Sequence, residues 1–287
     1  MAQILNLQQG SAEWLAHRAR HRNASETPAV LGVSPWLTPY GLWLARTGRR
    51  TPAVNPAMAR GTELEPAARA AYERLTGHVM QPLVMVDGQY SASLDGITLD
   101  GDLIVEIKVP WKGRDSELWR RVEKNDTPDY VAVQIEHQLA VSGARCAHLF
   151  VFDGREGVLL EQRPARDKWA QIGKAWDAFM QCVETDCPPP LVQGDTRERD
   201  DREWFDAAGR YLEARRRSDQ ADEELECARK ALVALAEHPS ERGAGVIVSR
   251  YFRRGAIEYK RIPALSGVDL DAYRGAGGEE VRVSVQK

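Results

Sequence analysis

The sequence predicts an α/β fold, in which a small mixed sheet is flanked by helices and followed by a C-terminal helical and hairpin appendage. Apolar residues at helical spacing precede, interrupt and follow runs of β-forming residues, which is the pattern of a layered α/β domain. Two of these runs flank Asp100-Gly101, a strong signal for a tight hairpin. The stretch Cys187-Pro188-Pro189-Pro190 stops any helix and cannot be a central strand. We therefore expect a first domain over residues 1–187 and a separate segment over residues 195–287.

Composition places the chain among ordinary globular proteins. It has 287 residues, of which 43% are hydrophobic and 28% charged, and its formal net charge is -3. These values fit one or two domains and exclude disordered and fibrous classes. A net negative charge also excludes a polycation that binds nucleic acid over its whole surface, so any such site must be a local concentration of basic residues.

The cysteines and the apolar runs bear on the compartment. Four cysteines are too few for a disulfide scaffold of this length, and none has the spacing of zinc or thiol redox motifs. Free thiols in a reducing compartment are expected. The N-terminus lacks the basic-then-apolar pattern of a signal peptide, and no run approaches the ~18 apolar residues of a membrane span. We expect a cytoplasmic protein without a membrane partner.

Helices are expected in the first part of the chain wherever a cap or a stop brackets apolar residues at helical spacing. Ser11 caps the first helix, Gly32 stops the second, and Gly77 stops the longest. The helical stretches are the one that begins after Ser11, 24–31 and 61–76. A loop around Trp36, flanked by Pro35 and Pro39, leads into residues 40–44.

After Gly77, two β-hairpins alternate with two helices. The hairpins turn at Asp100-Gly101 and Asp153-Gly154, each with a short apolar run on either side. The expected strands are 83–94, 103–109, 147–152 and 158–161, and the expected helices are 130–141 and 168–183.

The first hairpin carries the residues that suggest chemistry. With Asp100-Gly101 as a two-residue loop, Asp95 lies opposite Glu106, and Ser93 lies opposite Lys108. All four side chains then share one face, because residues two apart on a strand point the same way. Two carboxylates that face each other repel, so this pairing is favourable only around a bound cation.

An all-oxygen site of this kind favours Mg²⁺ or Mn²⁺ over zinc. Lys108 beside the ion can orient or deprotonate a water molecule, or stabilise charge on a phosphate. Glu65, on the helix over 61–76, is a third acid that can reach the same cation or a second one. Two ordinary interpretations stay open: a solvent-facing stripe in which Lys108 neutralises two acids, and an exposed Glu65–Arg69 pair. A bulge at Gly96 would break the expected register.

A phosphate site is indicated near the N-terminus. Arginine binds phosphate through a two-pronged fork, and Ser25 lies close to an expected helix N-terminus, where anions are favoured. The alternative is a solvated basic helix face. The positive charge of this region is carried by His17, Arg18, Arg20, His21 and Arg22.

A few further side chains are noted. Lys112 and Arg114, just past the second strand, are candidates for contacts along a DNA backbone. A helix histidine, His137, is expected to serve packing or hydrogen bonding rather than metal binding. Four tryptophans can stack on bases, but each by itself is expected to be a core or surface anchor: Trp36, Trp43, Trp111 and Trp119.

Together these features resemble the PD-(D/E)XK nuclease superfamily, and within it the phage lambda exonuclease and YqaJ-like viral recombinase family. The resemblance covers most of residues 8–185. It is carried by four stretches in the family's order: GSAEWLAHRARHRNASETPAVLGVSPW (10–36), RGTELEPAARAAYERLTG (60–77), SASLDG with VEIKVP (91–96 and 105–110) and QIEHQLAVSG (134–143). The family often has Pro before the aspartate, where this chain has Leu94, but the acid itself is in place.

The resemblance implies a restriction-endonuclease-like core and a set of catalytic residues. Asp95 and Glu106 match the metal-binding acids, Lys108 matches the catalytic lysine, and Glu65 matches the helical acid. The main-chain carbonyl of Ile107 would complete the coordination.

The resemblance also implies a set of groups that hold a terminal 5′-phosphate. Arg18, Ser25 and Ser93 match three of them, and a glutamine of the QIEHQ helix matches the fourth. Gln134 is the first choice for that glutamine, although the family often has Gln where this chain has Glu136.

The function that the resemblance implies is an Mg²⁺-dependent exodeoxyribonuclease, with Mn²⁺ as a substitute and two cations per active site. It would digest the 5′-ended strand of linear double-stranded DNA and leave 3′ single strands for recombination. A homotrimer and a single-strand annealing protein as partner are further implications. Two other functions stay open: an endonuclease of the same superfamily, and a non-catalytic DNA-binding or scaffold protein.

The segment after the prolines is highly charged. It contains a short seam at helical spacing, typical of a helical hairpin or of self-association: Ala221, Leu225, Ala228, Leu232 and Leu235. Residues 246–252 and 257–262 flank Arg253-Arg254-Gly255 and predict a basic-tipped hairpin that can contact DNA or pack on a neighbour.

Overall fold

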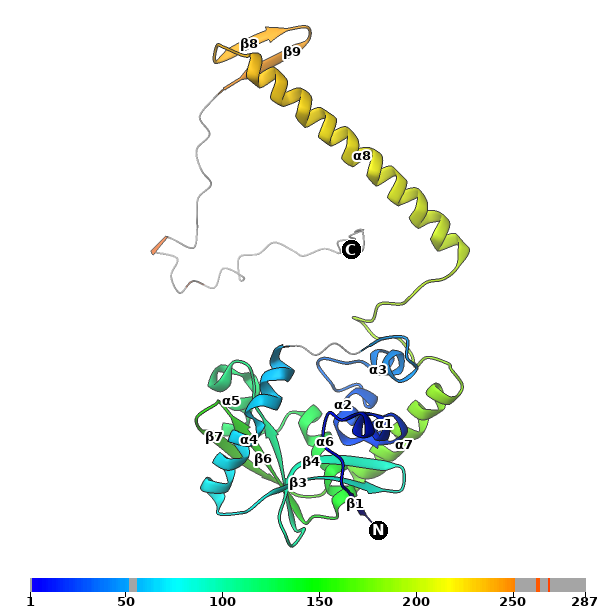
Figure 1. Cartoon of the computed structure of the whole chain (residues 1–287), viewed down its shortest axis with the longest axis vertical. Coiled ribbons are helices and arrows are strands. Elements are labelled where there is room, and N and C mark those ends of the chain that lie inside the picture. The colour runs from blue at the N-terminus through cyan, green and yellow to red at the C-terminus, as the bar shows by residue number, and fades with distance from the viewer. Residues whose placement is uncertain (1, 52–55, 251–261, 264–267, 269–287) are drawn as a thin grey trace. The chain divides into compact units, whose positions relative to one another are not determined.

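The computed structural model describes residues 2–51, 56–250, 262–263 and 268. The chain divides into two compact units, Met1–Arg197 and Glu198–Lys287 (Figure 1). The assignment of residues 1–187 to a nuclease domain and of residues 195–287 to an appendage stays a prediction. None of the described helices is both long enough and apolar enough to span a bilayer. All four cysteines are free thiols.

The first unit is a single sheet covered by helices (Figure 1). Its strands are β1 (Gln3–Leu5), β2 (Arg22–Asn23), β3 (Gln81–Asp87), β4 (Tyr90–Ile97), β5 (Leu103–Lys108), β6 (Cys146–Phe152) and β7 (Gly157–Gln162). Its α-helices are α1 (Ala12–Arg20), α2 (Thr27–Val30), α3 (Pro39–Arg46), α4 (Pro56–Thr76), α5 (Glu117–Glu123), α6 (Asp129–Ser142) and α7 (Arg166–Glu184). Two short 3₁₀ turns, η1 (Ala24–Glu26) and η2 (Gly113–Asp115), precede α2 and α5.

The strands run in the order β1-β3-β4-β5-β6-β7, and β2 also pairs with β4. The sheet is mixed, because β5 is parallel to β6 and β2 is parallel to β4, whereas the other pairs are antiparallel. The predicted α/β fold with a mixed sheet flanked by helices is thereby confirmed.

The expected run over 83–94 is two strands rather than one. β3 ends at Asp87 and β4 begins at Tyr90, and these two residues pair across the turn. Gly88 adopts a φ of 58°, which favours glycine. An Asp-Gly pair is present here too, but it lies inside an unbroken β-rich run that predicts one strand, and the two loop residues are Gly88 and Gln89.

The predicted register of the β4–β5 hairpin is confirmed where the two strands pair. Gly96 lies opposite Val105, and Ile97 lies opposite Ile104. The bulge at Gly96 that would have broken this register does occur, but it faces the other neighbour, β3. There the register shifts by one residue, so that Asp95 and Gly96 together face Pro82.

The bulge is built from residues that tolerate it. Pro82 has no N–H to leave unpaired opposite the extra residue. A Cβ atom on Gly96 would lie 2.7 Å from Met80 Cβ and 2.9 Å from Val105 Cγ1, so only glycine fits between the two neighbouring strands.

One edge of β4 is interrupted. β3 pairs along the whole of the opposite edge, so β2 and β5 must share the remaining one. β2 pairs with residues 90–91 and β5 pairs with residues 96–97. Among the described strands, none pairs with residues 92–95 on this edge. The gap between β2 and β5 is the position from which the candidate site is built.

Apolar clusters cover both faces of the sheet and fix the helices. The first lies between the sheet and helices α5 and α6 and includes Leu94, Ile104, Trp119, Ile135 and Leu149. The second lies on the other face beneath α4 and includes Ala68, Tyr72, Val105, Ile107 and Phe150. The third joins α2, α3 and α7 through Val30, Trp43, Ile172, Trp176 and Phe179.

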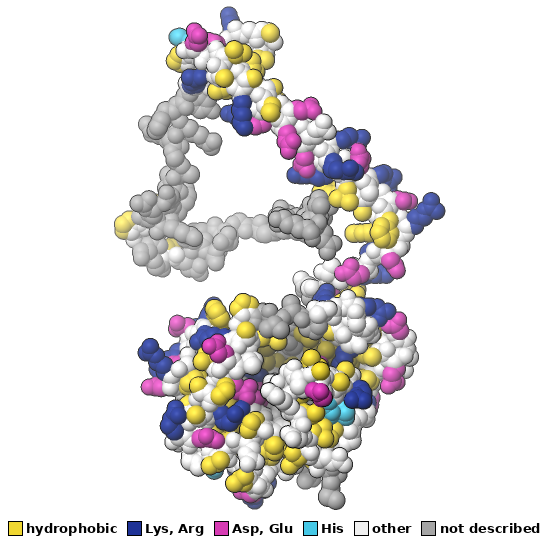
Figure 2. Space-filling view, viewed as in Figure 1, with side chains coloured by type: hydrophobic (Ala, Val, Ile, Leu, Met, Phe, Trp, Pro, Cys, Tyr) yellow, Lys and Arg dark blue, Asp and Glu magenta, His cyan; other side chains and the backbone are white. Residues whose placement is uncertain are grey.

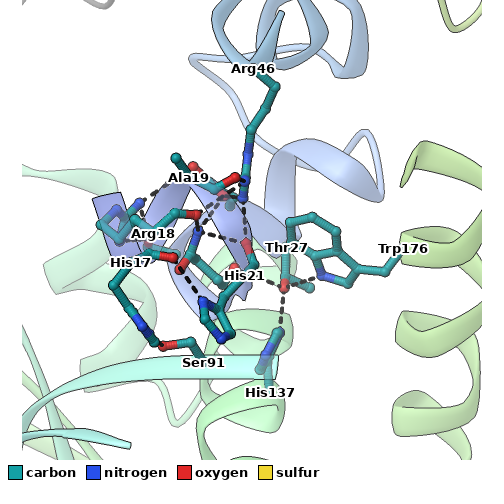
Figure 3. Close-up of polar contacts among 12 residues, drawn as sticks. His17, Arg18, Ala19, His21, Thr27, Arg46, Ser91, His137 and Trp176 are labelled. Atoms are coloured by element: carbon teal, nitrogen blue, oxygen red, sulfur yellow. Dashed lines mark hydrogen bonds and ion pairs between the residues drawn. The ribbon is translucent and has the colours of Figure 1, made fainter. Parts of the chain in front are cut away.

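His137 on α6 has a structural role, as expected. It is fully buried, and its Nδ1 lies 2.7 Å from Thr27 Oγ1 (Figure 3). The same hydroxyl accepts a hydrogen bond from Trp176 Nε1 at 3.0 Å. Burial lowers the pKa of His137 to about 3, so the ring is neutral near pH 7. These contacts tie α6 to α2 and α7.

The described part of the second unit contains one long helix, α8 (Arg202–Leu235), and the hairpin of β8 (Ser240–Gly243) and β9 (Val246–Ser249). Arg250 Nη2 donates to the carbonyls of Val233 and Ala236 at the end of α8. A strand beginning at residue 246 was expected, but its observed partner is β8. Apart from Ile262, the expected second strand over 257–262 lies outside the described residues, as does its basic tip.

Candidate active site

Asp95 fills the gap beside β5. Its Oδ2 accepts a hydrogen bond of 2.7 Å from the backbone N–H of Ile107. The side chain thus replaces the strand pairing that β4 and β5 lose beyond Gly96, and it satisfies a backbone donor that would otherwise have no partner. The bulge and the strand separation together bring this half-buried carboxylate next to β5.

Glu106 is the buried centre of a polar cluster, with only 3% of its surface exposed. Its Oε1 lies 2.6 Å from Lys108 Nζ and accepts a hydrogen bond of 2.7 Å from Gln134 Nε2. Lys108 Nζ in turn donates to Gln134 Oε1 at 3.1 Å. Gln138 Nε2 donates to the other carboxylate oxygen at 2.5 Å. Burial of Glu106 rules out a solvent-facing stripe, although Lys108 does balance its charge.

Glu65 reaches the same region from α4. Arg69 Nη2 donates to Glu65 Oε1 at 2.6 Å, and Arg69 Nε donates to the main-chain oxygen of Asp95 at 2.6 Å. The exposed fractions of the Arg69 and Glu65 side chains are 18% and 20%. The Glu65–Arg69 pair is therefore half-buried, and Arg69 links it to β4 through the main-chain oxygen of Asp95. It is not the exposed surface pair that the sequence left open.

The three acids interact electrostatically. Burial raises the pKa of Asp95 well above its usual range, and the charges of Glu106 and Glu65 raise it further. Burial also raises the pKa of Glu65. The charge of Arg69 lowers this pKa, and the charge of Glu106 raises it. Burial lowers the pKa of Lys108, but the neighbouring carboxylates of Glu106 and Asp95 raise it by more. The pKa of Lys108 is therefore raised, and the amine stays protonated.

Such mutual destabilisation is what a divalent cation relieves, and the donors are the hard oxygen ligands that Mg²⁺ and Mn²⁺ prefer. The residues present therefore fit a cation of this class in chemistry and charge. Within the described ranges, no three His, Cys, Asp or Glu side chains are grouped closely enough to form a preformed metal cage. Lys108 and Arg69 supply the positive charge next to two of the acids.

The predicted phosphate-binding residues form a second cluster. Both terminal nitrogens of Arg18 donate to Ser25 Oγ at 3.1 Å. The Arg18 guanidinium also lies 4.7 Å above the ring of Trp14, whose Nε1 donates to Ser93 Oγ at 3.1 Å. The chain of contacts thus runs from Ser25 through Arg18 and Trp14 to Ser93. Trp14 is the link that we did not predict, because nothing in the sequence pairs it with β4.

Arg46 holds the end of α1 that carries this cluster. Its guanidinium donates to the carbonyls of Arg18, Ala19 and His21 (Figure 3). It also forms an ion pair with Glu26, which accepts a longer bond of 3.4 Å from Arg18. These contacts cap the last turn of α1 and fix the position from which Arg18 extends.

The two clusters are connected by β4. Ser93 and Asp95 are two residues apart, and both lie on the stretch that no described strand pairs on the open edge. Gln134 belongs to the first cluster, because it contacts Glu106 and Lys108 rather than Arg18. The structure therefore brings the nine predicted site residues to one region of the sheet, in two adjoining groups.

Positions 134 and 136, the two candidates for the site glutamine, contact different partners from helix α6. Glu136 points away from Glu106 and accepts a hydrogen bond of 2.9 Å from the backbone N–H of Ala165. Gln134 and Gln138 lie one helical turn apart and both contact Glu106. That spacing was a usable signal for Gln138, which we did not predict.

Two basic residues that the sequence suggested for phosphate or DNA contacts are paired with acidic side chains instead. Arg22 is buried and donates to Tyr90 Oη at 2.9 Å and to Asp177 Oδ1 at 2.6 Å, so it ties β2 to α7 rather than facing a phosphate. Arg114 pairs with Asp153 at 2.7 Å and Glu156 at 2.5 Å, which leaves less charge for a DNA backbone.

The four tryptophans divide into buried and exposed pairs. Trp43 and Trp119 are core residues, as expected. Trp36 is 75% exposed and packs edge-on against Tyr130 with ring centroids 4.9 Å apart. Burial raises the pKa of Tyr130 and the charge of Lys108 opposes that shift, which places Tyr130 near the site. Trp111, also exposed, stacks with Arg60.

Comparison with known proteins shows which family this part of the chain is similar to. Residues 13–145 match the family model of the YqaJ-like viral recombinase domain. The uncharacterized protein YqaJ of Bacillus subtilis is 26% identical over 145 residues, which are 48% of this chain and 44% of that protein. The chain thus spans less than half the length of this curated relative.

Among solved structures, the fold is similar to that of an alkaline exonuclease from Laribacter hongkongensis, LHK-Exo. That crystal structure is 24% identical in sequence, with a TM-score of 0.51, and the match covers 62% of this chain and 94% of that chain. The structure of LHK-Exo in complex with dAMP matches with 26% identity and the same TM-score of 0.51. The resemblance seen in the sequence is thus confirmed as a match of residues 13–145 to the YqaJ-like viral recombinase domain model, and the fold is similar to that of a PD-(D/E)XK-like exonuclease.

Proposed function

We propose that this protein is an Mg²⁺-dependent exodeoxyribonuclease. It binds the end of a linear DNA duplex, hydrolyses the 5′-ended strand stepwise and leaves a 3′ single strand for recombination. The nuclease role is supported by the domain family and by the likeness to an alkaline exonuclease. Cation dependence, strand polarity and the residues that act are proposed from the site itself.

The observation that carries the proposal is the interrupted edge of β4. Asp95 lies in this gap and bonds to β5, next to Glu106 and Lys108, which are paired at 2.6 Å. Ser93, two residues earlier on the same edge, leads through Trp14 to Arg18. An acidic cluster beside a basic one is the arrangement needed to cleave one phosphodiester while a neighbouring phosphate is held.

Each group then has a role. Asp95, Glu106 and the carbonyl of Ile107, with Glu65 from α4, would hold the cations, and Mn²⁺ would substitute for Mg²⁺. Bound cations of this kind, two to a site, lower the pKa of water and stabilise charge on phosphate oxygens. Lys108 orients the attacking water or stabilises developing negative charge, and Gln134 fixes the Lys108 ammonium through its amide oxygen.

Further parts of the proposal concern organisation and partners. Residues 1–187 act as the nuclease domain, and residues 195–287 are an appendage. A homotrimer that encloses the DNA, and a single-strand annealing protein that receives the 3′ strand, are proposed from the family resemblance, as is a cytoplasmic location.

The test is digestion of matched linear and covalently closed circular duplexes with Mg²⁺. We expect the linear duplex to lose 5′ labels first and to retain 3′ labels on single strands, the closed circle to survive, and EDTA to stop the reaction. Cleavage of the closed circle as fast as the linear DNA would instead establish an endonuclease. No digestion of either DNA, with Mg²⁺ or with Mn²⁺, would leave only a binding or scaffold role.

The basic cluster gives a separate prediction. Replacing Arg18 with Gln is expected to reduce the preference for 5′-phosphate over 5′-hydroxyl ends by ~10-fold or more, because a hydrogen bond to a charged group contributes about 1.5–3 kcal/mol. Burial lowers the pKa of Arg18, but an arginine remains charged. The measurement is the initial digestion rate on the two kinds of linear end.

Arg20→Gln is the matched control, because Arg20 is exposed on the same helix and its Nε bonds to the carbonyl of Ala16. It should keep the wild-type preference. An unchanged preference in Arg18→Gln, or an equal loss in both variants, would argue against a phosphate site at Ser25 and Arg18.

A further inference from the structure

Helix α8 leaves its apolar residues uncovered. It is 34 residues long, or about 50 Å, and none of its residues is buried. Exposed fractions reach 52% at Trp204, 68% at Leu225 and 76% at Leu235. Figure 2 shows apolar side chains along α8 among basic and acidic ones. Long helices in water gain most of their stability by packing an apolar face, so this one needs an occupant.

Most apolar positions of α8 fall on one seam, whose one polar member is Ser218, whereas Phe205, Leu212 and Val233 lie outside it. The seam positions alternate in steps of three and four over nearly the whole helix, which is the heptad spacing of a coiled coil. The large side chains lie mainly at heptad position a (204, 211, 225 and 232), and the small ones lie mainly at position d (207, 214, 221 and 228). The seam consists of Trp204, Ala207, Tyr211, Ala214, Ser218, Ala221, Leu225, Ala228, Leu232 and Leu235.

We propose that α8 pairs with α8 of a second copy of this chain as an antiparallel two-stranded coiled coil. The pairing is centred between residues 219 and 220. It is an interface separate from the nuclease site and from any trimer that the nuclease domain forms.

Side-chain volume favours this partner and this direction. In the antiparallel register, no layer places two aromatic residues together, and each bulky residue meets a small one except Trp204 and Leu235, which meet each other. The layers pair Trp204 with Leu235, Ala207 with Leu232, Tyr211 with Ala228, Ala214 with Leu225 and Ser218 with Ala221 of the other copy. A parallel pair would stack like on like, so that layers of two alanines would alternate with layers of two large residues and leave voids.

Charge also favours a second copy. Basic residues lie just before the centre of the seam and acidic residues just after it. In the antiparallel register, Arg215 flanks Asp222 of the other copy, and Arg217 flanks Glu224. The two-fold axis repeats both pairs. A parallel arrangement would place Arg210 beside Arg215, which is repulsive. It would also place Arg217 beside Asp222 and Glu224 beside Arg229, which are attractive. Charge therefore supports pairing with a second copy, and side-chain volume sets the direction.

The first test measures the mass of the full-length protein in solution by light scattering. Leu225→Glu combined with Leu232→Glu puts charge into the seam, and the assembly mass is expected to fall to half or less of the wild-type value. Gln220→Glu combined with Ala234→Glu adds the same charge on the outer face of α8 and should leave the mass unchanged. An equal mass for all three proteins would overturn the proposal, since the seam would then be covered within one chain or not at all.

The second test fixes the direction. Ala214→Cys and Leu225→Cys are made in separate full-length proteins of different size, each with the exposed Cys187 and Cys227 replaced by Ser. The two proteins are mixed, allowed to exchange and oxidised. Disulfides between unlike proteins are expected, because residue 214 meets residue 225 of the other copy. Disulfides only between like proteins would show a parallel pair and refute the antiparallel one.

Discussion

Replacement of Lys108 with Met is expected to slow DNA cleavage by ~10³-fold or more, while the affinity for linear duplex stays close to that of the wild type. A positioned acid, base or charge-stabilising group contributes ~10²–10⁴-fold to the rate of such reactions. Lys108 is held for this role at 2.6 Å from Glu106 and 3.1 Å from Gln134 Oε1. Methionine keeps an unbranched stem of similar shape and removes the charged ammonium group.

The matched control for this experiment is Lys124→Met. Lys124 is exposed at the end of α5, so the same substitution removes one positive charge without touching the site. Rates from single-turnover digestion of labelled duplex, with binding measured in the presence of Ca²⁺, separate chemistry from affinity. A Lys108→Met protein that cleaves within a few-fold of Lys124→Met would show that the amine serves only to balance Glu106.

Local sequence signals predicted the parts of this site that depend on neighbouring residues. The Asp-Gly turn set the register of β4 and β5, and that register holds at Gly96 and Ile97. The alternation of side chains along β5 placed Glu106 and Lys108 on one face, where they pair. These features follow from turn geometry and the strand repeat, which a short stretch of sequence contains.

The environment of the site could not be predicted in the same way. Whether β5 faces solvent depends on α6, which is more than twenty residues away and buries Glu106 to 3% exposure. The two-residue strand β2, whose pairing brings α1 to the open edge of β4, has no local signature. Arg69 and Trp14 act across separate elements, so their contacts appear only when the chain is folded.

The proposed cation site makes a prediction for the protein without DNA. Replacing Asp95 with Asn is expected to raise the melting temperature in EDTA and to abolish the stabilisation that Mg²⁺ or Mn²⁺ gives the wild type. Burial, Glu106 and Glu65 raise the pKa of Asp95 in the folded state. A carboxyl group with a raised pKa in the folded state destabilises that state at every pH above its unfolded value, and hence near neutrality. Asparagine removes this charge and keeps an oxygen to accept the Ile107 N–H bond.

The same variant should lose cleavage by ~10³-fold or more, because the charge that would hold the cation is gone. Stabilisation by a bound ion follows its concentration relative to its dissociation constant, so a titration of melting temperature against Mg²⁺ reports binding independently of activity. Asp200→Asn, an exposed position before α8, is the matched control and should respond to Mg²⁺ as the wild type does. If Asp95→Asn kept both the Mg²⁺-dependent rise and the cleavage rate, Asp95 would not be a ligand. The function of the interrupted β4 edge would then have to be sought in DNA binding alone.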